Sequence, residues 1–164
     1  MKQVWYMILR GDYDNWDVPA LQAEYTQYKL DHEIPYDTLL FSDAKSTLDV
    51  LKAEGYKLGL ASSTIKIEII RAMKLTGLLP YFEVVLSGDD FEESKPNPEI
   101  YQVAMTRLNV APEETLVIED SEKGIAAGVD SGATVWGIKD NVFGLNQTRA
   151  AKLFDNLTQI VKQL

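Results

Sequence analysis

The sequence contains no cysteine and only one histidine, and these absences exclude several kinds of chemistry. Without cysteine the chain has no disulfide, no thiolate nucleophile and no zinc–thiolate site. This composition suits a reducing compartment, and we expect a cytoplasmic protein. The single histidine, His32, lies in a polar stretch and is expected at the surface rather than in catalysis.

Basic residues and long apolar runs are also scarce. Lys and Arg number 16 against 25 Asp and Glu, which gives a formal net charge of −9. This charge repels phosphodiester backbones and no local basic patch offsets it, so we expect no nucleic-acid partner. The apolar run at residues 4–9 is too short for a signal-peptide core, and no run reaches membrane-spanning length. We therefore expect no membrane partner.

The first forty residues differ in composition from the rest of the chain. They are rich in aromatic and acidic residues and poor in the β-branched runs of buried strands. Leu21, Tyr25 and Tyr28 recur at helical spacing after Pro19, and Pro35 closes the segment. We interpret residues 1–41 as a small helical subdomain in which the aromatic stripe packs.

From Ser42 onward, helix and strand patterns alternate. Ser42 is expected to cap a helix that carries Leu48 and Leu51 and ends at Gly55. The further elements expected are a strand at 57–61, a helix at 65–75, a strand at 84–86, a helix at 98–108, a strand at 115–118, a helix at 122–130, a strand at 134–138 and a last helix at 153–161. Such alternation with short connections predicts an α/β fold over residues 42–164, a three-layer parallel sheet covered by helices on both faces.

Polar residues follow the predicted strands, at the edge where ligands gather in such sheets. Ser62 and Ser63 offer hydroxyls and helix-start N–H groups to an anion, although serine is also an ordinary helix cap. Glu119 and Asp120 would repel each other unless a cation lay between them. Mg²⁺ prefers one or two carboxylates plus water and substrate phosphate, which fits this pair. The alternative is that Asp120 or Ser121 merely caps the next helix.

A third polar feature is Lys95, between these two pairs in the sequence. Pro96 and Pro98 fix the backbone after it and begin a helix, so the lysine is held in place. It could balance phosphate and carboxylate charge, or it could be one more solvated lysine. Asp89 and Asp90 are interpreted as a solvated loop, with a contribution to metal hydration as the alternative.

Three stretches together resemble the second, third and fourth motifs of the haloacid dehalogenase superfamily. They are Leu-Ala-Ser-Ser-Thr at 60–64, Glu-Ser-Lys-Pro-Asn-Pro-Glu-Ile-Tyr at 93–101 and Val-Ile-Glu-Asp-Ser-Glu-Lys-Gly-Ile-Ala-Ala-Gly at 117–128. The subgroup most similar is that of β-phosphoglucomutase and small sugar-phosphate phosphatases. The resemblance covers about residues 42–164, and it implies a Rossmann-like core and phosphoryl transfer through an aspartyl-phosphate.

The resemblance also implies roles for individual residues. Ser62, with the backbone of Ser63 after it, would hold the transferring phosphoryl group, and Lys95 would neutralise that group and the nucleophile. Asp120 would bind Mg²⁺ directly, while Glu119 would bind it or orient its waters. The implied cofactor is therefore Mg²⁺, and the implied partner is a small phosphorylated metabolite such as a sugar phosphate.

The first motif of the superfamily, an apolar strand ending in Asp-x-Asp-Gly-Thr, has no counterpart in the sequence. The string Asp12-Tyr13-Asp14 has the spacing but continues Asn-Trp-Asp, without the Gly-Thr turn. We therefore expect a chain that begins within a partial helical cap and lacks the first strand of the core. In relatives that strand lies between the strands that correspond to residues 58–61 and 116–118.

Two functions follow as alternatives, and two others are disfavoured. The first is a Mg²⁺-dependent phosphatase or phosphoglucomutase-like enzyme, inactive as this chain because the nucleophile is absent. The second is a non-catalytic remnant or a weak phosphate- or metal-binding module. A receiver domain is disfavoured because its acidic pair would follow the first strand, and a dinucleotide site because no Gly-x-Gly-x-x-Gly opens a helix.

Strand edges without a partner predict a poorly stable monomer or an oligomer.

Overall fold

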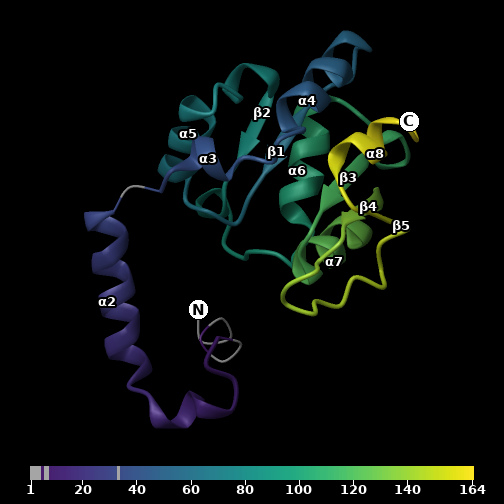
Figure 1. The fold of residues 1–164 in the computed structure, drawn as a ribbon. Helices are drawn as coiled ribbons and strands as arrows, with labels where there is room; N and C mark the ends of the chain where they lie inside the picture. Colours follow the sequence, from purple (N-terminus) through teal and green to yellow (C-terminus); the bar gives the residue numbers. More distant parts are fainter. Residues whose placement is uncertain (1–4, 6–7, 33) are drawn as a thin grey trace. The chain divides into compact units, whose positions relative to one another are not determined.

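The computed structural model describes residues 5, 8–32 and 34–164, which belong to two compact units, Met1–Pro35 and Tyr36–Leu164 (Figure 1). The smaller unit contains a 3₁₀ helix, Arg10–Asn15, and the helix α2, Val18–Asp31. Asp17 caps α2 by accepting a 3.0 Å hydrogen bond from the backbone N–H of Ala20. The helix predicted after Pro19 is therefore confirmed.

Aromatic packing in the smaller unit is limited. The Trp5 ring meets Tyr25 edge-on at 6.0 Å, and its Nε1 donates to Gln22 at 2.8 Å. Tyr28 stacks on His32 with ring centroids 3.9 Å apart. Tyr25 and Tyr28 are nevertheless 46% and 58% exposed, so the predicted aromatic stripe is only partly covered. His32 lies at the surface, as expected.

The larger unit alternates helices and strands almost as the sequence predicts. Its elements are α3 Tyr36–Leu39, α4 Ala44–Ala53, β1 Gly59–Ala61, α5 Lys66–Leu75, β2 Val84–Leu86, α6 Glu99–Leu108, β3 Leu116–Glu119, α7 Glu122–Asp130, β4 Thr134–Ile138, β5 Lys152–Phe154 and α8 Leu157–Val161, with short 3₁₀ helices at Leu79–Tyr81, Gly88–Asp90 and Pro112–Glu114. Helices α4 and α5 are followed by Gly55 and Gly77, whose φ angles of +84° and +69° favour glycine.

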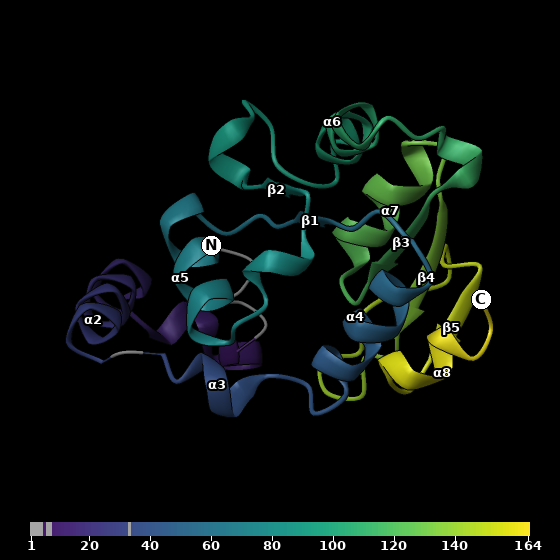
Figure 2. The ribbon, with the colours of Figure 1, turned by 90° about the horizontal axis from the view of Figure 1, so that it is seen from above.

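The strands form two parallel sheets rather than one. Strand β1 pairs with β2, while β3, β4 and β5 pair in that order. Among the described residues no backbone hydrogen bond joins the two sheets, so β1 and β3 each pair along one edge only (Figures 1 and 2). The α/β class with parallel strands is thus confirmed, and the sheet is divided between β1 and β3.

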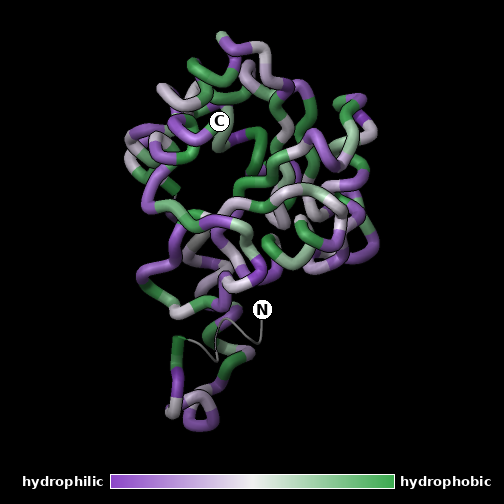
Figure 3. The backbone as a smooth tube through the Cα atoms, turned by 90° about the vertical axis from the view of Figure 1, so that its right-hand side faces the viewer, coloured by the Kyte–Doolittle hydropathy of each residue, from purple (hydrophilic) through white to green (hydrophobic). Residues whose placement is uncertain are grey.

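One hydrophobic core serves both sheets. Helix α6 packs on β1 and β2, α7 packs on β3 and β4, and α6 contacts α7. Leu86, Ile125 and Val135 are at most 1% exposed and belong to a single cluster that spans these elements. Figure 2 shows α6 on one side of the strands, with α4 and α8 on the other. In Figure 3 hydrophobic segments run through the middle of this unit and hydrophilic ones occupy many outer loops.

Two predictions about helix ends were wrong. The residue at the N-cap position before α4 is Asp43 rather than Ser42, and its side chain does not cap the helix. The Asp43 carboxylate instead accepts from the Thr158 N–H at 2.8 Å and hydroxyl at 3.0 Å. This contact ties the start of α8 to the start of α4. The last helix was predicted to begin at residue 153, which is too early. Lys152–Phe154 is strand β5, and Asn156 then caps α8.

Candidate phosphate and metal site

The centre of the site is an ion pair that links the ends of β1 and β3. Lys95 Nζ lies 2.5 Å from Glu119 Oε1, and the two side chains are only 8% and 9% exposed. The same ammonium donates to the carbonyl of Ala61 at 3.1 Å and to the Tyr101 hydroxyl at 2.8 Å. Because Ala61 ends β1 and Glu119 ends β3, the lysine spans the boundary between the two sheets.

The second oxygen of Glu119 is bound on the other side of the pair. Oε2 accepts from the backbone N–H groups of Asp120 at 3.2 Å and Ser121 at 3.3 Å, and from the Ser121 hydroxyl at 3.1 Å. Ser121 also caps α7 by accepting from the Gly124 N–H at 3.0 Å. A Cβ at Gly124 would lie 2.0 Å from the carboxyl carbon of Glu119, so only glycine leaves room here.

The electrostatics of this cluster follow from burial and from the lysine. Burial acts to raise the pKa of Glu119, but the charge of Lys95 and hydrogen bonds from Lys95 and Tyr101 outweigh it, and the pKa lies below its ordinary value. Burial and the nearby Glu119 charge raise the pKa of Tyr101 well above its ordinary range. At neutral pH the Glu119 carboxylate is therefore ionised. The Tyr101 phenol stays protonated and donates a 2.5 Å hydrogen bond to it.

Asp120 differs from its neighbour in being exposed. Within the described part of the chain its carboxylate makes no hydrogen bond or ion pair, whereas its backbone is held at both ends. Its N–H donates to Glu119, and its carbonyl accepts from Gln147 Nε2 at 2.7 Å. Ser121, rather than Asp120, is the helix cap. The Asp120 side chain is thus available to a cation in solution.

The serine loop after β1 is fixed by the loop after β2. Ser62 donates its N–H to the Leu86 carbonyl at 3.1 Å, and its hydroxyl oxygen accepts from the Thr64 N–H at 3.1 Å. Ser63 is exposed. A Cβ at Gly88 would lie 2.7 Å from the Ser63 carbonyl oxygen, so the two loops are in close contact. Ser62 directly follows Ala61, the residue whose carbonyl binds Lys95.

The acidic residues after β2 are tied into the structure. Asp90 accepts from the Ser87 N–H at 2.7 Å and forms a 3.2 Å ion pair with Lys66, while Asp89 accepts from the Lys66 N–H at 3.0 Å. The backbone hydrogen bond from Ser87 contributes most to holding the pKa of Asp90 below its ordinary value. Both residues are exposed, as the interpretation of a solvated loop expects, and both carboxylates also hold the start of α5.

The residues present fit a partly hydrated Mg²⁺ better than a closed metal cage. No group of three or more metal-binding side chains occurs among the residues that the structure describes. Mg²⁺ is commonly held by one or two carboxylates, with water and substrate phosphate completing its shell. Asp120 offers one free carboxylate, whereas both Glu119 oxygens already accept hydrogen bonds. Such an ion would depend on substrate oxygens for part of its coordination.

Three residues that shape the site were not predicted from the sequence. Tyr101 lies within the stretch 93–101, and its helical position six residues after Lys95 was the available signal. Gly124 lies three residues after the helix cap Ser121, and a glycine inside a helix is unfavourable unless packing requires it. Gln147 had no signal, because it reaches Asp120 from 27 residues further along the chain.

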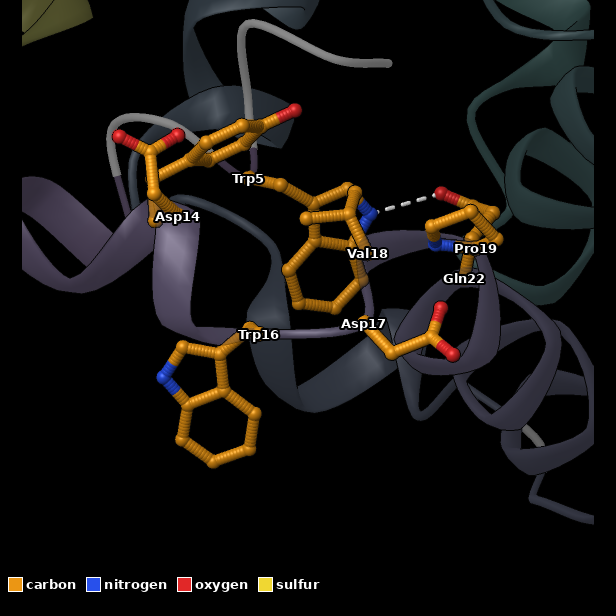
Figure 4. A pocket seen from close by; sticks show the side chains of 8 residues that line it. Trp5, Asp14, Trp16, Asp17, Val18, Pro19 and Gln22 are labelled. Atoms are coloured by element: carbon orange, nitrogen blue, oxygen red, sulfur yellow. Dashed lines mark hydrogen bonds between the residues drawn. The ribbon is translucent and has the colours of Figure 1, made fainter.

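The string Asp12-Tyr13-Asp14 lies in a different setting from these residues. It belongs to the 3₁₀ helix of the smaller unit and follows no described strand. A shallow pocket there is lined by Trp5, Tyr13, Asp14, Trp16, Asp17, Val18, Pro19 and Gln22 (Figure 4). Trp5 and Trp16 are among its lining residues, and Asp17 is already used as the α2 cap. Among the described helices of the chain, none combines the length and the apolar composition needed to cross a bilayer.

Fold and site together define an α/β domain with polar and charged groups at the carboxyl ends of parallel strands. The family of haloacid dehalogenase-like hydrolases matches residues 4–138. The chain belongs to this family.

Individual relatives agree with this assignment. The chain is 37% identical over 108 residues to pyrophosphatase PpaX of Bacillus pumilus, covering 63% of this chain and 48% of the relative. It is 36% identical over 107 residues to a phosphorylated carbohydrates phosphatase of Thermotoga maritima, covering 65% and 48%. The solved structure of a HAD phosphatase from Thermococcus onnurineus matches with a TM-score of 0.70 at 31% identity, covering 83% and 67%. The chain spans about half the length of these curated relatives.

Proposed function

We propose that the chain supports Mg²⁺-dependent phosphoryl transfer on a small phosphorylated metabolite, as a phosphatase or a β-phosphoglucomutase-like enzyme. One observation carries the proposal: the buried Lys95–Glu119 pair lies between the ends of β1 and β3, with Asp120 free beside it and Ser62 next to the Ala61 carbonyl. Pyrophosphate and sugar phosphates are both candidate substrates, given the names of the relatives. The cytoplasm is the expected compartment.

Each residue has a role that its contacts support. The Ser62 oxygen accepts from Thr64, which leaves its O–H free to donate to a phosphoryl oxygen. Lys95 is fixed by three acceptors and would act on the phosphoryl group as an immobile positive charge. Asp120 would hold Mg²⁺, while Glu119 would position Lys95 and the Asp120 backbone. The metal would supply neutralisation of phosphate charge.

We propose that these 164 residues do not supply the aspartate nucleophile and that the chain alone is inactive for this reason. We further propose that the nucleophile arrives on a strand that pairs between β1 and β3. Two facts support this: both strands pair along one edge only in the described structure, and the Lys95 ammonium lies where their carboxyl ends meet. An aspartate at the carboxyl end of such a strand would lie beside Lys95 and Asp120.

The metal assignment is tested by ion binding to the chain itself. We expect Mn²⁺, followed by electron paramagnetic resonance and displaced by Mg²⁺, to bind the parent chain and to be lost in Asp120→Asn. The matched control is Glu122→Gln, because Glu122 is an exposed carboxylate two residues away in the first turn of α7. Equal Mn²⁺ binding by Asp120→Asn and the parent would contradict the proposal.

A non-catalytic phosphate- or metal-binding module is the second candidate function, and the absent nucleophile favours it. It uses the same Ser62, Lys95 and Asp120 and differs only in having no turnover. Mg²⁺-dependent hydrolysis of a generic phosphate ester that Asp120→Asn abolishes would exclude it.

A further inference from the structure

Gln147 is a buried polar residue, at 7% exposure. Its amide is fully hydrogen-bonded. Nε2 donates to the carbonyls of Asp120 and Ile138, both at 2.7 Å, and Oε1 accepts from the Asp140 N–H at 2.9 Å. One side chain therefore contacts the end of β3, the end of β4 and the loop that follows β4.

The two carbonyls that Gln147 binds continue the register of β3 and β4. The last paired residues are Glu119 and Gly137, so Asp120 and Ile138 are the next positions on the two strands. Beyond the last pair the strands no longer hold each other through their ladder. The Gln147 amide donates to both carbonyls and so links the two strand ends one residue beyond their last paired residues.

The loop that carries Gln147 is itself ordered by hydrogen bonds. The Asp140 carboxylate accepts from the backbone N–H groups of Val142 and Phe143, both at 2.9 Å, and of Leu145 at 2.7 Å. The loop from 140 to 147 is therefore held by hydrogen bonds within itself, including the one from the Asp140 N–H to Gln147. Gln147 thus contacts Asp120 from an ordered loop.

We infer that Gln147 is a positioning residue for the metal-binding carboxylate of Asp120. This inference rests on the proposed function. The Asp120 side chain has no hydrogen bond of its own in the described structure, so its direction depends on its backbone. Glu119 holds the N–H of that backbone and Gln147 holds the carbonyl. Removing such an outer contact commonly weakens metal binding by about 10–100-fold.

The test compares Mn²⁺ affinity in three variants of the whole chain. Gln147→Met keeps the length but removes every hydrogen bond, and Gln147→Glu loses both donors and sets a carboxylate against two carbonyls. We expect the Mn²⁺ dissociation constant to rise roughly 10–100-fold in both. The matched control is Ser131→Ala, which loses a buried 2.6 Å hydrogen bond to the Gly128 carbonyl at the opposite end of α7. It should leave Mn²⁺ affinity unchanged.

A second readout separates positioning from general loosening of the fold. Affinity for orthophosphate without metal depends on the serine loop after β1, so it should stay at the parent value in the Gln147 variants. Near-ultraviolet circular dichroism identifies which variants are folded. If Asp120→Asn abolishes Mn²⁺ binding while the folded Gln147 variants bind like the parent, the inference is wrong and the metal site stands. If the parent binds no Mn²⁺, or Asp120→Asn binds it equally, the proposed function itself fails.

Discussion

At the scale of single residues, the buried pair of Lys95 and Glu119 dominates the energetics of the site. A buried ion pair gains little over apolar side chains of the same size, because desolvation offsets the attraction. Breaking such a pair is costly, since one charge is then left without its partner. The three acceptors of Lys95 and the five donors to Glu119 show that both charges are fully hydrogen-bonded. The arrangement therefore fixes geometry more than it adds stability.

The corresponding prediction is that Lys95→Met lowers the free energy of unfolding by about 3–5 kcal/mol, because Glu119 remains buried without its cation. The double variant Lys95→Met/Glu119→Gln should recover much of this loss. Urea denaturation of the single and double variants at neutral pH measures both effects. The matched control is Lys139→Met, whose 2.7 Å pair with Asp155 is roughly half exposed. Its cost should stay below about 1 kcal/mol.

The pH dependence of this variant has a definite sign. In the parent the pKa of Glu119 is held below its ordinary value, so the pair stabilises the fold above the unfolded pKa of 4.5 and is lost as pH falls. In Lys95→Met burial acts without the lysine and raises the Glu119 pKa. The deficit relative to the parent should therefore shrink as the pH is lowered towards 4.5. A deficit that stays constant with pH would contradict the buried charge as its cause.

At the scale of elements, the approach of α7 to the end of β3 decides whether the site can form. Gly124 lies in the first turn of α7, against the Glu119 carboxylate at the end of β3. Alanine is favoured over glycine in helices by about 1 kcal/mol, which alone would make Gly124→Ala stabilising. The clash is the larger effect, because the added Cβ would lie 2.0 Å from the carboxyl carbon of Glu119, which five hydrogen-bond donors hold in place.

We therefore predict that Gly124→Ala lowers the free energy of unfolding by about 1–3 kcal/mol and weakens Mn²⁺ binding, because Glu119 and the Asp120 backbone must shift. Urea denaturation and Mn²⁺ titration measure the two effects. Gly11→Ala is the matched control, since a Cβ at Gly11 meets nothing within 4 Å and its φ is not positive. A Gly124→Ala chain as stable as the parent would show that the α7 approach tolerates a side chain.

Most elements of the larger unit could be predicted from the sequence, because their signals are local. Ser121 and Gly77 mark helix ends, and the apolar runs at 84–86 and 134–138 match β2 and β4. Strand β5 could not be recognised, since its three residues are too few for a period and merge with the apolar positions of α8. The Asp43 contact with Thr158 was equally hidden, because a carboxylate that can cap its own helix gives no sign of a distant partner.

Within the site, the sequence identified the groups that carry charge but not those that position them. Ser62, Glu119 and Asp120 stand at strand ends, and Lys95 lies shortly before α6, in a recognisable order. Tyr101 and Gly124 lie within the same quoted stretches, yet their contacts with Glu119 depend on how α6 and α7 pack. Gln147 acts across the sheet ends, and only the register of β3 and β4 reveals why a buried amide is needed there.

At the scale of the whole molecule, the acidic charge and the divided sheet set the conditions for function. A net charge of −9 disfavours any phosphorylated ligand, so we propose that binding comes from Lys95, backbone N–H groups and a divalent cation at one edge of the strands. The edges of β1 and β3 that lack a strand partner in the described structure also offer pairing to another segment or to a second molecule. Oligomerisation through these edges remains our expectation for the chain alone.

The most direct test is hydrolysis of p-nitrophenyl phosphate, with and without Mg²⁺, by this chain and by a version that carries an added apolar strand ending in Asp-x-Asp. The account predicts Mg²⁺-dependent activity only in the extended version, and loss of that activity when Asp120→Asn is added. Activity in the unextended chain would contradict the account and would direct attention to Asp12 and Asp14. Inactivity of both versions would contradict the enzyme and favour the binding module.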